Sequence, residues 1–103
     1  DAMLNWGAWV LQGRIDGDSE LALSFMRKLA NRGFAEQTVY AAFYYLRKCS
    51  DVEKYPNEQE NINNLNDWLQ ICRPDAYQKF RKGKLTQEHL LEEVAAAAGM
   101  RFL

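Results

Sequence analysis

Residues 21–49 carry the pattern that most constrains the fold: two apolar stripes of helical period on either side of a glycine. The stripes are Leu21, Phe25 and Leu29 before Gly33, and Val39, Phe43 and Leu46 after it. Apolar residues three or four positions apart lie on one face of an α-helix. A glycine between two such stretches suits the left-handed residue that follows a helix end. The segment predicts two helices joined at Gly33, either as a helix-turn-helix that reads nucleic acid or as two walls of a helical core.

The other segments show the same spacing, together with residues that favour helix ends. We expect helices over the ranges 2–12, 18–32, 35–49, 60–73, 74–81 and 86–98. Charged residues and Pro56 mark a long loop near 50–59. Each half of the chain, at about 50 residues, is too small to fold comfortably alone. Because no segment alternates as a strand does, the sequence predicts an all-α, compact single-domain bundle of five or six short helices over residues 1–103.

Composition sets the size and content of the core. With 103 residues, of which 48% are hydrophobic and 26% charged, the chain is long enough to form one core without a metal or a disulfide. Trp6 and Trp9 are three positions apart, so we expect both on one buried face of the first helix. Trp68 is expected in the core. Gly7 weakens the first helix, and we expect it to allow the close approach of a second one.

Charge and cysteine content indicate the compartment and exclude some partners. The net charge is −1, from 13 basic and 14 acidic residues, which does not favour binding to nucleic acid mainly through phosphates. No apolar run approaches the roughly 18 residues that span a bilayer. The first residues lack a basic-then-apolar signal sequence. We therefore expect a cytoplasmic protein that does not bind membranes. Cys49 and Cys72 are expected as free thiols, with a single disulfide between the third and fourth helices as the alternative that the sequence leaves open.

Residues that carry chemistry are few. His89 is the only histidine, so any histidine-dependent nucleophile would need it, and a position in the first turn of a helix favours exposure to solvent. The chain has no glycine-rich phosphate loop and no clustered spacing of metal ligands. We expect a protein that is not an enzyme and that uses no cofactor and no metal ion.

Aromatic and basic residues on the expected third and fifth helices favour protein binding. Aromatic and arginine side chains dominate the strongest contacts of protein interfaces. We expect a regulatory or adaptor protein, whose partner-binding residues are Tyr40, Tyr44 and Arg47, with Lys79, Arg81 and Lys82 as an electrostatic rim. The Ala95–Ala98 run and the C-terminal apolar residues pack in a homodimer as readily as in a monomer, so the oligomeric state stays open.

DNA binding is the alternative. In a helix-turn-helix, the second helix lies in the major groove and presents side chains to base edges. The residues that serve this function are Arg27, Lys28 and Arg32 as phosphate contacts, with Gln37, Thr38 and Arg47 facing the bases. This reading makes the 35–49 helix the recognition helix and predicts affinity that falls steeply with salt.

Two short stretches resemble parts of known helical families. Residues 4–10, with the sequence Leu-Asn-Trp-Gly-Ala-Trp-Val, resemble the Trp-Gly-x-Trp opening of some phage antitermination proteins. Trp68, Tyr77, Phe80 and the segment 90–100 resemble the closing part of a sterile-alpha-motif domain. Each resemblance covers a small part of its family's pattern, so neither carries a function to this chain. Small, aromatic-rich helical proteins are frequent among bacterial and phage accessory factors, which fits the expected adaptor role.

Overall fold

The computed structural model describes residues 2–99, most of which are helical. The elements are α1 (Ala2–Leu11), α2 (Ser19–Asn31), the 3₁₀ helix η1 (Ala35–Thr38), α3 (Val39–Cys49), α4 (Glu58–Cys72), α5 (Pro74–Arg81) and α6 (Gln87–Ala97). This described part contains six α-helices and no strand, so the predicted all-α bundle is confirmed. None of these helices combines the length and the apolar character that crossing a membrane requires.

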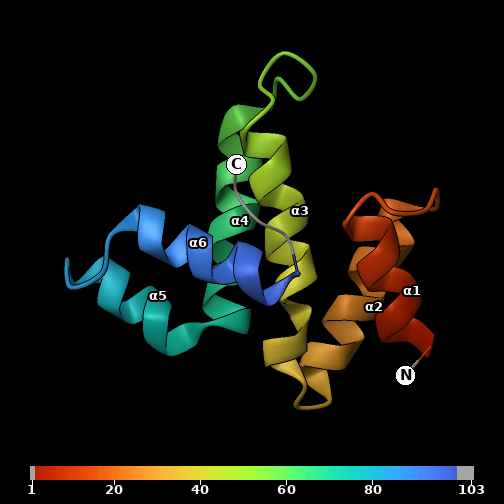
Figure 1. Cartoon of the computed structure of the whole chain (residues 1–103), viewed down its shortest axis with the longest axis horizontal. Coiled ribbons are helices and arrows are strands. Elements are labelled where there is room, and N and C mark those ends of the chain that lie inside the picture. Colours follow the sequence, from red (N-terminus) through yellow and green to blue (C-terminus); the bar gives the residue numbers. More distant parts are fainter. Residues whose placement is uncertain (1, 100–103) are drawn as a thin grey trace.

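The helices form three consecutive hairpins (Figure 1). The α3–α4 hairpin lies in the centre, with α1–α2 on one side and α5–α6 on the other. The outer hairpins reach the centre through contacts of α1 with α3, α2 with η1 at the start of α3, α5 with α4, and α6 with α3. The result is one compact bundle with principal extents of 37 × 35 × 24 Å.

Helix ends lie where the local signals predict. The Asp18 carboxylate caps α2 by accepting from the Glu20 and Leu21 amides at 3.0 and 3.2 Å. Gly33 follows α2 with φ +93°, and the amides of Gly33 and Phe34 donate to the carbonyls of Ala30 and Leu29, which is the Schellman pattern.

Two further helices, α5 and α6, also begin where local residues favour a helix start. Pro74 occupies the first turn of α5, where its missing N–H is not needed. The Thr86 hydroxyl caps α6 by accepting from the His89 amide at 3.2 Å. The predicted loop near 50–59 is the 50–57 connection, and α4 begins at Glu58, two residues earlier than expected.

The face that α2 buries differs from the predicted stripe. Ala22, Leu23, Met26 and Leu29 are buried, whereas Leu21 is 44% exposed. The contact with α1 sets this rotation, because an ideal Cβ on Gly7 would lie only 2.9 Å from Met26 Cε. Gly7 thus permits the close helix approach that the sequence predicts, and it draws Ala22 and Met26 rather than Leu21 into the contact.

One of the predicted core tryptophans lies outside. Trp6 is half-buried, with its ring edge against Phe25 at a centroid distance of 5.6 Å, but Trp9 is 45% exposed. The buried face of α1 runs from Gly7 to Leu11, and Trp9 lies about 60° further from this face than Trp6. The prediction for Trp68 is confirmed, because its side chain is 2% exposed and the Arg27 guanidinium lies 5.1 Å from its ring centroid.

The predicted 35–49 helix is split into η1 and α3. Thr38 joins the two parts, and its hydroxyl donates to the Ala35 carbonyl at 2.6 Å. Thr38 is completely buried, as Val39 nearly is. The predicted apolar stripe of α3 is confirmed, since Val39, Phe43 and Leu46 all lie in the core.

Candidate functional site

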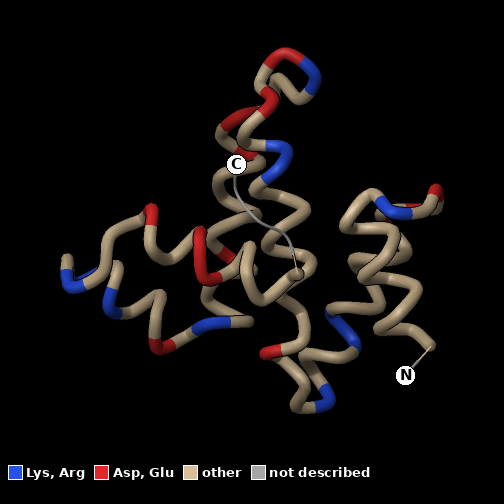
Figure 2. Tube along the Cα trace, viewed as in Figure 1, with Lys and Arg blue, Asp and Glu red and all other residues tan. Residues whose placement is uncertain are grey.

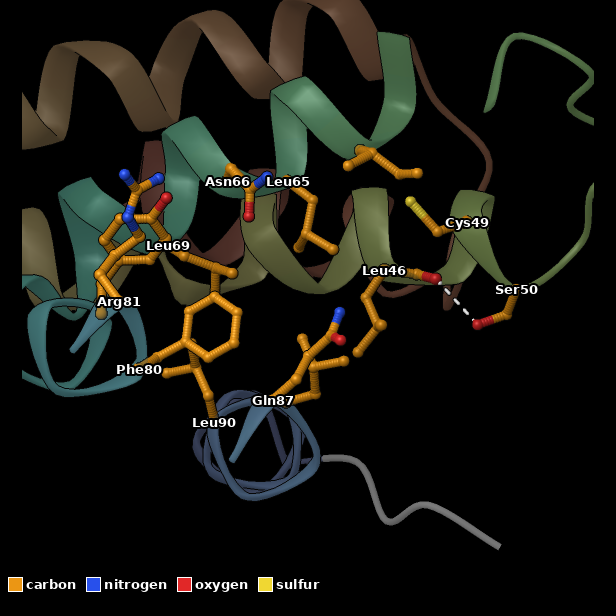
Figure 3. Close-up of a pocket in the computed structure, with 13 residues that line it drawn as sticks. Leu46, Cys49, Ser50, Leu65, Asn66, Leu69, Phe80, Arg81, Gln87 and Leu90 are labelled. Atoms are coloured by element: carbon orange, nitrogen blue, oxygen red, sulfur yellow. Dashed lines mark hydrogen bonds between the residues drawn. The ribbon is translucent and has the colours of Figure 1, made fainter. Parts of the chain in front are cut away.

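An open groove of about 570 Å³ separates the α3–α4 hairpin from the α5–α6 hairpin (Figure 3). Its floor consists of five buried side chains: Leu46, Leu65, Leu69, Tyr77 and Leu90. Ile62, Phe80 and Leu91 form more accessible apolar walls, and Ile62 is 36% exposed. Figure 3 shows Leu46, Phe80 and Leu90 pointing into the same space from three helices. An accessible apolar groove of this kind is the common form of a binding site.

The corner between α4 and α5 sets the position of the groove's outer wall. Arg73 has φ −141° and ψ 64°, so the chain leaves the helical path there before Pro74 starts α5. The Arg73 Nη1 donates to the Glu36 carbonyl at 3.1 Å and to the Cys72 carbonyl at 2.6 Å. Its Nε lies 3.8 Å from the Glu93 carboxylate. Arg73 thereby connects this corner to η1 and to α6.

Polar side chains lie along the rim of the groove. Arg81 is at one end and Cys49 with Ser50 at the other, while Asn66 and Gln87 lie between them on opposite sides (Figure 3). The Ser50 hydroxyl donates to the Leu46 carbonyl at 3.0 Å. Arg81 and Gln87 are exposed, so both side chains are accessible to a bound molecule.

The three predicted basic rim residues do not line the same hollow. Lys79, Arg81 and Lys82 are all exposed and lie at the end of α5 or directly after it. Figure 2 shows basic residues, in blue, at this end of α5 and in the loop that follows. Arg81 lines the groove, whereas Lys79 lines a separate hollow with Arg73 and Glu93. Lys82 follows the last residue of α5 and lines neither hollow. Of the predicted set, only Arg81 reaches the groove.

The predicted aromatic face of α3 lies away from the groove. Tyr40 and Tyr44 are half-buried, and neither lines the groove. Arg47 is exposed, but its guanidinium lies 6.0 Å from the Phe43 ring centroid and against Gly13, after α1. Helical geometry explains the separation, because Tyr40, Tyr44 and Arg47 occupy a different side of α3 from Leu46 and Cys49. The structure does not bring the two predicted partner-binding sets together.

The residues of the DNA-binding alternative differ in their exposure. Arg27, Lys28, Arg32 and Gln37 are exposed, as phosphate or base contacts require. Thr38 is fully buried, however, so it is not available to a base in this structure. α3 packs against α1, α4 and α6, and Arg47 is its one exposed residue. At the N-terminal end, where a recognition helix contacts base edges, Gln37 is exposed and Thr38 and Val39 are buried.

The thiols and the histidine are not arranged for nucleophilic chemistry. Cys49 and Cys72 are both free. Burial raises the pKa of Cys72 to about 11, and burial followed by the charge of Glu58 raises the pKa of Cys49. Both thiols are therefore protonated near neutral pH, whereas the thiolate is the reactive form. His89 is exposed, and its Nδ1 lies 3.1 Å from the Thr86 hydroxyl. In residues 2–99, no three His, Cys, Asp or Glu side chains converge as a metal site requires.

Most of the groove residues belong to apolar stripes of helical period, which on their own are typical of a core. On α4 the stripe includes Ile62, Leu65 and Leu69, and Ile62 is the one that α5 and α6 leave uncovered. Phe80 and Leu91 are likewise apolar members of stripes that are only partly covered. The periodicity of each helix was visible, but nothing in the sequence gives the distance between two hairpins.

Comparison with known proteins gives no relative from which a function can be transferred. No protein-family model, no curated protein sequence and no solved structure matches this chain.

Proposed function

We propose that this protein is a non-enzymatic adaptor that binds an acidic amphipathic helix of a partner protein in the groove between α3–α4 and α5–α6. The observation that carries the proposal is the groove itself, with a buried floor, accessible apolar walls and an arginine at one end. An amphipathic helix that places its apolar face in such a groove is a recurrent mode of protein recognition.

The apolar walls supply the driving force for binding. Ile62, Phe80 and Leu91 keep part of their surface in contact with solvent in the free protein. Covering this surface with the apolar side chains of a partner is favourable by about 25 cal/mol per Å² of area removed from water, before the costs of association. Phe80 and Arg81 are neighbours at the same wall, and aromatic and arginine residues are enriched among the strongest interface contacts.

Charge at the two ends of the groove favours an acidic partner in one orientation. Arg81 lies at one end, and Lys82 follows it in the chain. At the other end, Glu58 lies near enough to Cys49 to contribute to its raised pKa. An acidic residue of the partner is therefore attracted to the Arg81 end and repelled from the Cys49 end, which fixes the direction of the helix.

The proposal that the protein is not an enzyme has separate support. The thiol of Cys72 is buried and has a pKa of about 11, and Cys49 also has a raised pKa. Of the residues that the structure describes, those lining the groove are mainly apolar and include no carboxylate and no histidine. A groove of this composition provides surface for binding rather than groups for proton transfer.

The test uses two designed peptides of about 18 residues, which is about five helical turns. They share one apolar face, and their polar faces consist of Glu in one peptide and Lys in the other. We expect the acidic peptide to bind the full chain in fluorescence anisotropy and the basic peptide to bind at least about tenfold more weakly. The Arg81→Glu variant should reduce this preference, because it reverses the charge at the rim.

A matched pair of variants locates the binding surface. Ile62→Glu places a carboxylate in the groove wall, and Leu21→Glu places one on a similarly exposed apolar position outside the groove. Both positions lie in the first third of their helices, where an acidic side chain is tolerated. We expect Ile62→Glu to weaken binding of the acidic peptide about tenfold or more and Leu21→Glu to leave it unchanged. Equal effects of the two variants, or no binding of the acidic peptide, would overturn the proposal.

A further inference from the structure

A second feature lies where α3 meets the 50–57 connection. Three tyrosine rings surround one ammonium group: Lys48 Nζ lies 4.9 Å from the ring centroid of Tyr44, 5.7 Å from Tyr45 and 5.3 Å from Tyr55. All three distances are within the range of a cation–π interaction, which extends to about 6 Å. Tyr44 and Tyr45 meet edge to face, with centroids 5.2 Å apart. We call Tyr44, Tyr45 and Tyr55 the tyrosine cage.

The cage holds the Lys48 ammonium through ring faces alone. No carboxylate in residues 2–99 lies within ion-pair distance of this ammonium. The three tyrosines are half-buried, so part of each ring is accessible. Lys28 provides a contrast, because its ammonium lies over the single ring of Phe25 at 5.9 Å. Lys48 is thus enclosed by three rings from two segments, whereas Lys28 lies over one ring.

An open hollow of about 330 Å³ lies beside the cage. Tyr45, Tyr55 and Lys48 line it, together with the carboxylates of Glu20 and Glu60. These carboxylates act on the cage, since both contribute, after burial, to raising the pKa of Tyr45. The side chains of Asn57, Asn61 and Asn64 add amide groups to the same wall. Lys54 also lines the hollow, with its ammonium 5.5 Å from the Tyr55 ring centroid, so two lysines balance the two carboxylates until Lys48 leaves. With Lys48 displaced, the hollow offers aromatic faces and a net negative charge, the two features that attract an organic cation.

We propose that the tyrosine cage is a binding site for the trimethylammonium group of a methylated lysine in a partner protein, and that Lys48 occupies the site in the free protein. Lys48 is a flexible side chain without an ion pair here, so its displacement breaks only ring contacts. A quaternary ammonium is less strongly hydrated than a primary one and is the cation that aromatic cages recognise. Glu20 and Glu60 then face the incoming positive charge.

The carboxylates of Glu20 and Glu60 favour one of two possible sources of the trimethylammonium group. A choline headgroup carries a phosphate close to its trimethylammonium, and Glu20 and Glu60 would repel this phosphate. A trimethylated lysine carries only an aliphatic stem and a peptide backbone. The charges therefore favour the lysine. This inference does not rest on the groove, because the cage and the hollow share no lining residue with it.

The experiment removes the lysine that occupies the cage. Trimethyl-lysine amide is titrated into the full-length wild-type chain and into Lys48→Ala, and binding is followed by shifts of the tyrosine ring signals in NMR spectra. We expect Lys48→Ala to bind about tenfold more tightly than the wild type, since no lysine competes for the rings. Lys28→Ala is the matched control, because it removes a lysine that lies over one ring outside the cage, and its affinity should equal that of the wild type.

Three further arms make the result specific. An uncharged ligand of the same shape, with a tert-butyl group in place of trimethylammonium, should not bind, because its attraction to the rings lacks the charge. Tyr55→Leu in the Lys48→Ala background should remove binding, and Tyr55→Phe should retain it; Tyr55 lies in the connection and outside the core cluster, so both variants are expected to fold. Phosphocholine should bind more weakly than trimethyl-lysine amide. The proposal is overturned if Lys48→Ala binds no trimethyl-lysine, binds the uncharged ligand equally well, or prefers phosphocholine.

Discussion

Two helix contacts on opposite sides of the molecule are made by residues of very different size. Within the α1–α2 hairpin, Gly7 lies against Ala22 and Met26, and an ideal Cβ on Gly7 would lie only 2.9 Å from Met26 Cε. On the opposite side, α5 faces α4 with the large rings of Tyr77 and Phe80, and a groove of about 570 Å³ stays open. Small residues let backbones approach, whereas aromatic residues hold helices apart unless the space is filled. The same chain therefore has one closed contact and one open one.

The largest effect is expected from truncating the closed contact. Met26 is completely buried between α1 and α2, so Met26→Ala should lower the free energy of unfolding by about 2–5 kcal/mol. Phe80 is half-exposed in the groove wall, and Phe80→Ala should cost clearly less. Urea unfolding of the two variants measures both values. Equal losses would mean that the groove is packed as tightly as the α1–α2 contact.

The two cysteines provide a second contrast, through pH. Cys72 is completely buried, with a pKa of about 11 in the folded protein against an ordinary value near 9, whereas the more accessible Cys49 lines the groove. The unfolded thiol loses its proton first as the pH rises. The contribution of the protonated Cys72 thiol to the free energy of unfolding is therefore fully present below pH 9. The free energy of unfolding then falls by about 2–3 kcal/mol between about pH 9 and 11.

Urea unfolding at a series of pH values tests this loss. Lysines and tyrosines also titrate in this range, so Cys72→Ala is the reference. We expect the free energy of unfolding of the variant to fall less steeply with pH than that of the wild type. Identical slopes would show that the Cys72 thiol is not desolvated in the folded protein.

Substitutions at Gly7 test the α1–α2 contact by adding a side chain rather than by removing one. Gly7→Leu inserts a side chain where Met26 Cε already lies 2.9 Å from an ideal Cβ, so a loss of about 1–3 kcal/mol is expected. Gly7→Ala should be close to neutral, because the gain of about 1 kcal/mol in helix propensity offsets a small shift of the flexible Met26 end. Thermal and urea unfolding compare the two variants. A neutral Gly7→Leu would contradict the close approach of α1 and α2.

The smallest effects are expected from removing the two helix caps. Comparing the two variants separates an effect on stability from an effect on peptide binding. Asp18 caps α2 beside the closed contact, and Thr86 caps α6, whose first turns form one wall of the groove. Asp18→Ala and Thr86→Ala should each cost about 1 kcal/mol of stability. Only Thr86→Ala should also weaken binding of the acidic peptide, because it loosens the wall that carries Gln87 and Leu91. Equal affinity of both variants would remove α6 from the binding surface.

Helix ends were predictable from the sequence, as was a close helix approach at Gly7, but which faces of two helices meet was not. Asp18, Gly33, Pro74 and Thr86 act within one turn of their own helix, so the sequence around each residue contains the whole signal. The exposure of Trp9 depends instead on which face of α1 meets α2, and that choice follows from Gly7 and Met26 together.

The candidate site shows the same limit. Arg81 was among the predicted partner-binding residues and lines the groove, but Tyr40, Tyr44 and Arg47 lie on another side of α3. Their spacing places them on one helix face without indicating which helices cover the other faces. The tyrosine cage escaped prediction for a related reason, since Tyr55 reaches Lys48 only because the 50–57 connection folds back toward α3.

The central claim is that the open contact, and not the closed one, receives a partner. Cys49 lines the groove and reports on it directly, because a bound helix covers its thiol. The measurement is the rate of alkylation of Cys49 in the Cys72→Ala variant, with and without a saturating concentration of the acidic amphipathic peptide. We expect the acidic peptide to slow the reaction about tenfold or more and the basic peptide to have no effect. An alkylation rate unchanged by a bound acidic peptide would show that the partner surface lies elsewhere.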